Sequence, residues 1–158
     1  MLRPLQLGDD APWKRRYRAA AIVNAQLARG NPARGLVTST QSGQYQLYAW
    51  DVRTGFLRQL THKAEGVPAG TISHDGKYVY FLQDQSGNEM GHLVRMGWEG
   101  GEPQDLTPDL PPYSAFGMSM DRGGTMLGTV MSDESGFHLV TLPLNGSSAA
   151  FWWSAGCG

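Results

Sequence analysis

The apolar residues in the middle of the chain come in short runs separated by turn-forming residues. Two such runs are Tyr78–Leu82 and His92–Met96, and Ser86-Gly87-Asn88 lies between them. Asp75-Gly76 precedes the first run and Gly100-Gly101 follows the second. Runs of about five residues, rich in Tyr, Val and Phe and bounded by Gly, Asp and Asn, are typical of antiparallel strands joined by tight turns. We therefore expect a β-hairpin over residues 78–96.

This pattern recurs along the chain with an offset of 46 residues. Leu47, Leu93 and Leu139 are related by this offset. The other matches are Asp75 with Asp121, Gly55 with Gly101, and Leu60-Thr61 with Leu106-Thr107. A period in the forties, with about four short strands per unit, is the mark of a β-propeller blade. The sequence predicts an all-β fold, a partial β-propeller of two to three four-stranded antiparallel blades.

The repeat divides the chain into an N-terminal segment at 1–34, an array of repeats of about 46 residues at 35–146, and a divergent tail at 147–158. We expect four-stranded units at about 35–61, 69–107 and 116–144. The register fails in the tail. The offset predicts Gly at 147 and Leu-Thr at 152–153, where the chain has Ser147 and Trp152-Trp153.

The N-terminal segment carries no repeat. Residues 1–18 are polar and contain Pro4 and Pro12, so we expect an extended or irregular conformation there. Ala19–Arg29 is rich in helix formers and predicts a short helix, although Ile22-Val23 would also suit a strand.

Composition and charge exclude several classes of protein. The net charge of −1 gives no reason to expect nucleic acid or an anionic membrane as a partner. The one basic cluster, Lys14-Arg15-Arg16 with Arg18, is interpreted as a solvated terminal segment rather than a polyanion site. No apolar run reaches the ~18 residues of a membrane span. Cys157 is the only cysteine and the first residues lack the apolar core of a signal peptide, so we expect a cytoplasmic protein without disulfides.

The residues with reactive side chains follow the repeat. His92 and His138 share one repeat position, which Gln46 occupies in the first unit, so a structural role is favoured over catalysis there. His62 and His74 are scattered, and no H-x-x-x-H or C-x-x-C spacing occurs. The turn aspartates are interpreted as turn residues rather than metal ligands, and they are Asp75, Asp84, Asp121 and Asp133. We expect no catalytic residue, no metal site and no cofactor in this chain.

Several phrases of the sequence resemble one enzyme family. SHDGKYVYF at 73–81 resembles a strand motif of bacterial propellers, with His74 in place of the usual proline. The longer phrases are APWKRRYRA, GLVTSTQSGQYQLYAWDV, SGNEMGHLVR and EGGEPQDLTPDLPPYS. Together they resemble the N-terminal propeller of prolyl oligopeptidase-type serine peptidases, over about residues 10–146, and most of all members similar to acylaminoacyl and dipeptidyl peptidases.

This resemblance implies a two-domain enzyme whose propeller restricts access to peptides and whose C-terminal α/β-hydrolase domain supplies a Ser-Asp-His triad. Family propellers have about seven blades, of which this chain would hold roughly two and a half. No G-x-S-x-G elbow occurs, and the nearest imitation, Gly117–Asp121, fails at its last position. The leading hypothesis is a non-catalytic propeller fragment of such a peptidase. The alternative is a stand-alone propeller module that binds a protein or peptide.

Glu89 is the one candidate substrate-binding residue. Peptidases that recognise a free N-terminus use propeller carboxylates to pair with the substrate ammonium group. Glu89 follows Gly87-Asn88 at the end of the expected hairpin and could project in that way. The competing interpretation is a solvent-facing carboxylate at a strand end.

An incomplete ring of blades predicts self-association. The outer faces of the first and last units would expose apolar strand residues, with Val37 and Leu127 as examples, and Trp152 and Trp153 would add to the apolar surface. We expect the 158-residue chain to oligomerise or aggregate at micromolar concentration.

Overall fold

The computed structural model describes residue 4, residues 6–144 and residues 150–156. It contains one short helix, α1 (Pro12–Arg18), followed by strands only. In chain order the strands are β1 (Ile22–Ala28), β2 (Asn31–Ser39), β3 (Gln46–Asp51), β4 (Leu57–Gln59), β5 (Thr71–Ile72), β6 (Tyr78–Asp84), β7 (Gly91–Gly97), β8 (Gly100–Asp105), β9 (Ser114–Met120), β10 (Met126–Asp133), β11 (Gly136–Pro143) and β12 (Ala150–Gly156).

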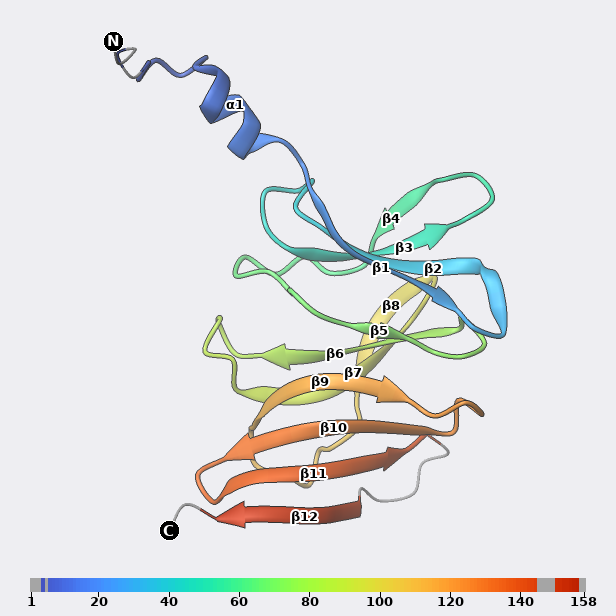
Figure 1. Ribbon diagram of the computed structural model, residues 1–158. Coiled ribbons are helices and arrows are strands. Elements are labelled where there is room, and N and C mark those ends of the chain that lie inside the picture. The colour runs from blue at the N-terminus through green and yellow to red at the C-terminus, as the bar shows by residue number, and fades with distance from the viewer. Residues whose placement is uncertain (1–3, 5, 145–149, 157–158) are drawn as a thin grey trace.

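The strands form three four-stranded sheets, β1–β4, β5–β8 and β9–β12, each an antiparallel meander in chain order. The sheets follow one another through the molecule, with α1 standing apart from the first of them (Figure 1). The all-β fold and the propeller-like blades predicted from the repeat are confirmed. The hairpin expected at 78–96 is β6–β7, which pairs without a bulge from Tyr78↔Gly97 to Asp84↔Gly91.

The N-terminal segment differs from its prediction in two places. The helix expected at Ala19–Arg29 is wrong, because Ile22–Ala28 is β1, which pairs along β2. Helix formers are outweighed there because β1 pairs with β2 along its length, with register shifts near both ends, and because β-branched Ile22 and Val23 suit a strand. The helix lies instead in the stretch expected to be irregular, with Pro12 in its first turn and arginines in its last.

The C-terminal tail, which breaks the sequence repeat, nevertheless supplies the fourth strand of the third sheet. Its backbone at Ala150–Gly156 pairs with β11 from Gly136↔Gly156 to Thr141↔Ala150. Backbone pairing demands no particular side chain, so this strand forms although the offset positions carry different residues. The side chains of Trp152 and Trp153 lie outside the described residues.

Two apolar cores lie between successive sheets. The first joins β2 and β3 to β6 and β7 through Leu36, Leu47, Phe81 and Val94, among other residues. The second joins the second and third sheets, with Tyr80, Leu93, Leu127, Met131, Val140 and Leu142 among its members. The second blade therefore buries one face against the first blade and the other against the third.

Val37 and Leu127 were expected on exposed end faces, and that expectation is wrong. Both are buried. Leu127 belongs to the core between the second and third sheets, so it faces inward. Val37 lies in an inner strand, flanked across the sheet by Ala25 and Tyr48.

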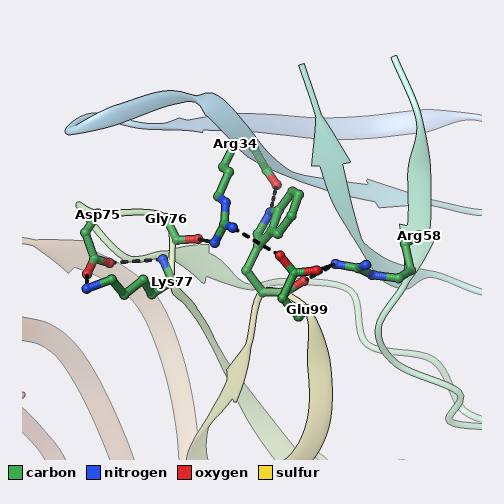
Figure 2. Close-up of polar contacts among 8 residues, drawn as sticks. Arg34, Arg58, Asp75, Gly76, Lys77 and Glu99 are labelled. Carbon is green, nitrogen blue, oxygen red and sulfur yellow. Dashed lines mark hydrogen bonds and ion pairs between the residues drawn. The ribbon is translucent and has the colours of Figure 1, made fainter. Parts of the chain in front are cut away.

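Polar contacts also join the first two sheets. The indole Nε1 of Trp98 donates to the Gly35 carbonyl oxygen at 2.8 Å. The guanidinium carbons of Arg34 and Arg58 lie 4.4 and 5.2 Å from the centroid of its ring. Figure 2 shows both arginines converging on Glu99, with Nη2 to carboxylate distances of 3.0 and 2.7 Å. Because Arg34 also donates to the carbonyl of Gly76, blade one is held to the Asp75-Gly76 turn of blade two.

Candidate functional site

A groove is lined by residues from all three sheets. It has a volume of about 440 Å³. Its lining residues come from β1, β6, β9, the loop before β5 and the β6–β7 turn, which contributes one residue, Glu89. The full set is Asn24, Gln26, Gly66, Val67, Pro68, Ala69, Gly70, Leu82, Asp84, Glu89, Ser114, Ala115, Phe116, Gly117 and Met118. The strands β1, β5 and β9 are the first strands of the three successive sheets (Figure 1). The groove is therefore built from all three blades.

The β6–β7 turn brings Glu89 to this groove by an unusual backbone path. Ser86, Gly87 and Glu89 have φ values of 56°, 77° and 59°, in the left-handed region that non-glycine residues seldom adopt. The Glu89 N–H donates to Asp84 Oδ2 at 3.2 Å, and the Glu89 carbonyl accepts from Ser114 Oγ at 2.8 Å. The main chain of Glu89 is therefore tied to β6 and β9 while its side chain stays exposed.

The β6–β7 hairpin is two residues longer than its counterparts when it is measured between matching pairs of residues. Leu82 pairs with Leu93 in blade two. The matching pairs are Thr38 with Leu47 in blade one and Val130 with Leu139 in blade three, each two positions closer in sequence. Glu89 thus lies in the longest of the three hairpins, although the unpaired turn has six residues both in the second blade (85–90) and in the first (40–45). The change of spacing is a sequence signal that comparison of the repeats strand by strand would have found.

The groove combines two carboxylates with apolar walls. Asp84 and Glu89 line it on one side, and Val67, Leu82 and Phe116 are among its apolar residues. None of the described lining residues is a lysine or an arginine. Such a site favours a cation that carries an apolar group, because the carboxylates have no basic partner within the groove.

The side chains at the repeat position shared by Gln46, His92 and His138 all make polar contacts. Gln46 donates to the Lys63 carbonyl at 2.5 Å and accepts from Thr61 Oγ1. His92 Nδ1 lies 2.6 Å from Asp105 Oδ2, and the His92 ring stacks on Tyr113 with centroids 5.9 Å apart. Each of these side chains bonds within its own blade, outside the groove.

A Ser-His-Asp cluster occurs at the β10–β11 turn, but its arrangement is not that of a triad. Ser135 Oγ and Asp133 Oδ1 lie 2.9 and 3.1 Å from the same ring nitrogen, Nε2 of His138. In a triad the imidazole stands between the two, with the carboxylate on Nδ1. Here Ser135 donates directly to Asp133 at 2.6 Å. Hydrogen bonds from the Ser135 hydroxyl and N–H and from His138 lower the pKa of Asp133 to about 2, which makes that carboxylate a feeble base.

The turn aspartates cap backbone N–H groups, as their turn interpretation requires. Asp75 accepts from Lys77, and Asp121 accepts from Gly123, Thr125 and Met126. The N–H of Met126 contributes most to lowering the pKa of Asp121. Asp75 and Asp121 occupy different turn positions, however. Ser73, which accepts from the Tyr78 N–H, is the counterpart of Asp121.

Two further features, metal-ligand clusters and membrane-spanning helices, do not occur among the described residues. Within them, no three His, Cys, Asp or Glu side chains gather as metal ligands would. In the same part of the chain, no helix combines the length and apolar character needed to cross a membrane.

The chain resembles several proteins of known structure in its fold. No family model and no curated protein matches the chain. TolB from Acinetobacter baumannii superposes with a TM-score of 0.56 and 22% identity, over 78% of this chain and 30% of its own. A puromycin hydrolase superposes at 0.63 and 18%, over 84% and 20%. A TolB-like protein from Agrobacterium tumefaciens superposes at 0.65 and 15%, over 87% and 50%.

These likenesses support a propeller fold related to that of the enzyme family that the sequence resembles. At sequence identities of 15–22%, structural likeness is evidence for a shared fold and not for a shared function. The chain spans between 20% and 50% of the structures named above, so the activity of a whole protein is not transferred from them.

Proposed function

We propose that this chain is the propeller portion of a prolyl oligopeptidase-type serine peptidase, and that its groove receives the amino terminus of a peptide. The observation that carries the proposal is the position of Glu89 on the β6–β7 turn, where it lines the groove together with Asp84. A peptide ammonium group would pair with these carboxylates. The side chains of the first residues of the peptide would contact the apolar residues of the groove.

In this proposal, the chain itself does not cleave peptide bonds. The propeller would select and orient peptides, and a hydrolase domain would cut them. The puromycin hydrolase likeness supports this assignment, because a propeller of the same fold occurs in a protein with that name.

The test uses two matched peptides and the purified chain. A tripeptide of apolar residues with a free α-amino group is titrated into the ¹⁵N-labelled protein, and its N-acetylated form is titrated in parallel. We expect the free peptide to shift the amide signals of Glu89, Ser114 and Gly117. Acetylation should weaken binding roughly tenfold, since it removes a charge-assisted hydrogen bond.

Two variants locate the effect. Glu89→Gln keeps the shape of the side chain and removes its charge, so it should reduce the preference for the free amino terminus. Glu134→Gln is the matched control, because Glu134 is an exposed carboxylate in the corresponding turn of blade three. Equal binding of both peptides to the unmodified chain would refute the amino-terminus site.

The alternative function is a stand-alone propeller module that binds a protein or peptide. Its support is the likeness to TolB structures, since one of them matches this chain over half of its own length. A hydrolase domain encoded directly downstream of residue 158 would favour the peptidase. Further propeller repeats with no hydrolase would favour the binding module.

A further inference from the structure

Strand β9 borders two adjoining hollows along its whole length. The groove that contains Glu89 is lined by residues 114–118 of this strand. A second hollow, of about 220 Å³, is lined by residues 118–121 and shares Gln26 and Met118 with the groove. Successive side chains of a strand point to opposite faces of its sheet, so consecutive residues border one hollow only where it runs beside the backbone. The two hollows therefore follow the backbone edge of β9.

The edge of β9 that faces these hollows is open. In the part of the chain that the structure describes, β9 pairs along one side only, with β10. The other side makes backbone bonds just before the strand begins, because Tyr113 exchanges both N–H···O=C bonds with Gly91 at 3.0 Å. The direction of the backbone groups alternates along a strand, so the N–H and C=O of Ala115 point to the same side as those of Tyr113. Ala115 therefore offers a donor and an acceptor to the groove that it lines.

The same edge stays available farther along β9. The strand has a bulge at Gly117, which is skipped in the pairing with β10 and has a φ of 61°. After the bulge, the N–H of Asp121 donates to the carbonyl of Met126, the first residue of β10. Alternation then turns the backbone groups of Met118 and Met120 away from β10. These two residues likewise offer backbone groups to the hollows.

The two ends of this edge carry different charges. At the start of β9, Ser114 Oγ donates to the Glu89 carbonyl, and Asp84 accepts from the Glu89 N–H, so both carboxylates of the groove belong to this end. At the far end, Arg29 lines the second hollow. Asp121 also lines it, but its carboxylate accepts three backbone N–H groups of its own turn. A peptide that enters with its ammonium group at the carboxylate end matches this order of charge.

We propose that the peptide received by the groove binds as an added strand along the open edge of β9 and parallel to it. This inference rests on the proposed function, which places the amino terminus of the peptide beside Glu89 and hence at the start of β9. The peptide then runs in the direction of β9, whose seven residues span about 20 Å. Main-chain bonds of this kind recognise an extended backbone. The ligand class is therefore an extended peptide of about seven residues with a free amino terminus.

The first test uses peptides methylated at single backbone nitrogens. Heptapeptides of one sequence, each with a free amino terminus and one N-methyl group at residue 2, 3 or 4, are titrated into the unmodified ¹⁵N-labelled chain. Neighbouring amides of an added strand point to opposite sides. Methylation should therefore weaken binding about tenfold either at residue 3 alone or at residues 2 and 4 alone. Equal effects at all three residues, or no effect at any, would overturn the added strand.

The second test removes a donor from the protein. Ala115→Pro deletes the outward N–H, and proline is tolerated on an edge strand where its nitrogen faces away from the sheet. Free and N-acetylated peptides should both bind roughly tenfold more weakly, with the ratio of their affinities unchanged. Glu89→Gln should instead change that ratio. If a folded Ala115→Pro chain binds both peptides as the unmodified chain does, the added strand is wrong. If circular dichroism shows that this variant unfolds, the methylated peptides decide, because they are tested on the unmodified chain.

A nitroxide on the last residue of the heptapeptide tests the direction. Parallel pairing should broaden the amide signals of Ser119 and Met120 more than that of Ser114, and the reverse order would overturn it. Failure of the strand and failure of the amino-terminus site give different results. A retained preference for the free amino terminus without alternation in the methylated series refutes the strand alone. Alternation with equal binding of free and acetylated peptides refutes the amino-terminus site.

Discussion

Residues at the same repeat position in different blades make similar kinds of contact. Gln46, His92 and His138 differ in chemistry, yet each bonds polar groups of its own blade from the same strand position. Their identities are interchangeable because the position needs a polar side chain, not a titrating one. Glu89 is the contrary case, since its hairpin is two residues longer than the matching hairpins of the other two blades.

Asp133 supplies a prediction about pH. Its pKa in the folded chain is about 2, below the usual value of 3.8. A carboxyl whose folded pKa is depressed stabilises the fold above its unfolded pKa, and that stabilisation is lost as the pH falls toward the folded value. The unmodified chain should therefore lose stability between pH 4 and pH 2 more steeply than Asp133→Asn.

Urea unfolding at a series of pH values checks this expectation. The two stability curves should be furthest apart near neutral pH and converge toward pH 2, because the unmodified carboxyl is then protonated. Glu134→Gln, in the same turn, should follow the unmodified curve. Parallel curves for Asp133→Asn and the unmodified chain would show that the Ser135 and His138 contacts contribute nothing to stability.

At the scale of elements, each blade is a simple meander and the contacts between blades hold the array together. The described contacts between the first two blades include apolar burial, the bond from Gln26 to the Gly70 carbonyl, and the cluster around Trp98. Exposed ion pairs contribute little on their own. Burial of the Trp98 ring and its hydrogen bond should therefore outweigh the Glu99 ion pairs.

Trp98 provides the test at this scale. Trp98→Ala removes a side chain that is 8% exposed and leaves a cavity between two blades, so it should cost about 3–5 kcal/mol of unfolding free energy. Trp98→Phe keeps an aromatic ring under Arg34 and Arg58 but loses the bond to Gly35, and should cost about 1–2 kcal/mol. Glu99→Gln should change stability by less than about 1 kcal/mol.

Urea unfolding of the three variants measures these differences. The expected order of destabilisation is Trp98→Ala, then Trp98→Phe, then Glu99→Gln. If Glu99→Gln costs as much as Trp98→Ala, the ion pairs rather than the indole join the blades.

At the scale of the whole molecule, the groove depends on the arrangement of all three blades. Its lining residues come from β1, β6 and β9, from the loop before β5 and from the β6–β7 turn. Because no single blade supplies the whole lining, a loss of contact between blades would also alter the groove.

The whole chain should be silent toward serine-hydrolase reagents. No nucleophile elbow occurs in the sequence, and Ser135 hydrogen-bonds to a carboxylate whose pKa is about 2. Incubation with a fluorophosphonate probe, followed by intact-mass measurement, should show no adduct. Stoichiometric labelling that maps to Ser135 and is abolished by Ser135→Ala would overturn our interpretation of the cluster at the β10–β11 turn.

Much of the fold follows from local pattern, because strands and turns have short-range signatures. Short Tyr- and Val-rich runs bounded by glycine predict β6–β7, and the spacing of Leu47, Leu93 and Leu139 predicts three equivalent blades. The sequence indicated only part of the candidate site. Glu89 was singled out from the sequence, whereas Asp84 was interpreted only as a turn residue and Ser114 was not considered, because groove neighbours from different strands share no sequence spacing.

The amino-acid sequence by itself determined the strand pattern, the blade repeat and the turn chemistry, since these depend on residues within a few positions of one another. Only the tertiary structure decided what each element pairs with. Residues 22–28 are a strand because β2 offers them a ladder, and residues 150–156 complete a sheet because β11 offers another. Leu93 and Leu139 occupy the same repeat position, yet one is buried and the other exposed. The reason is physical: burial depends on the neighbouring blade, and no residue carries that information in its own side chain.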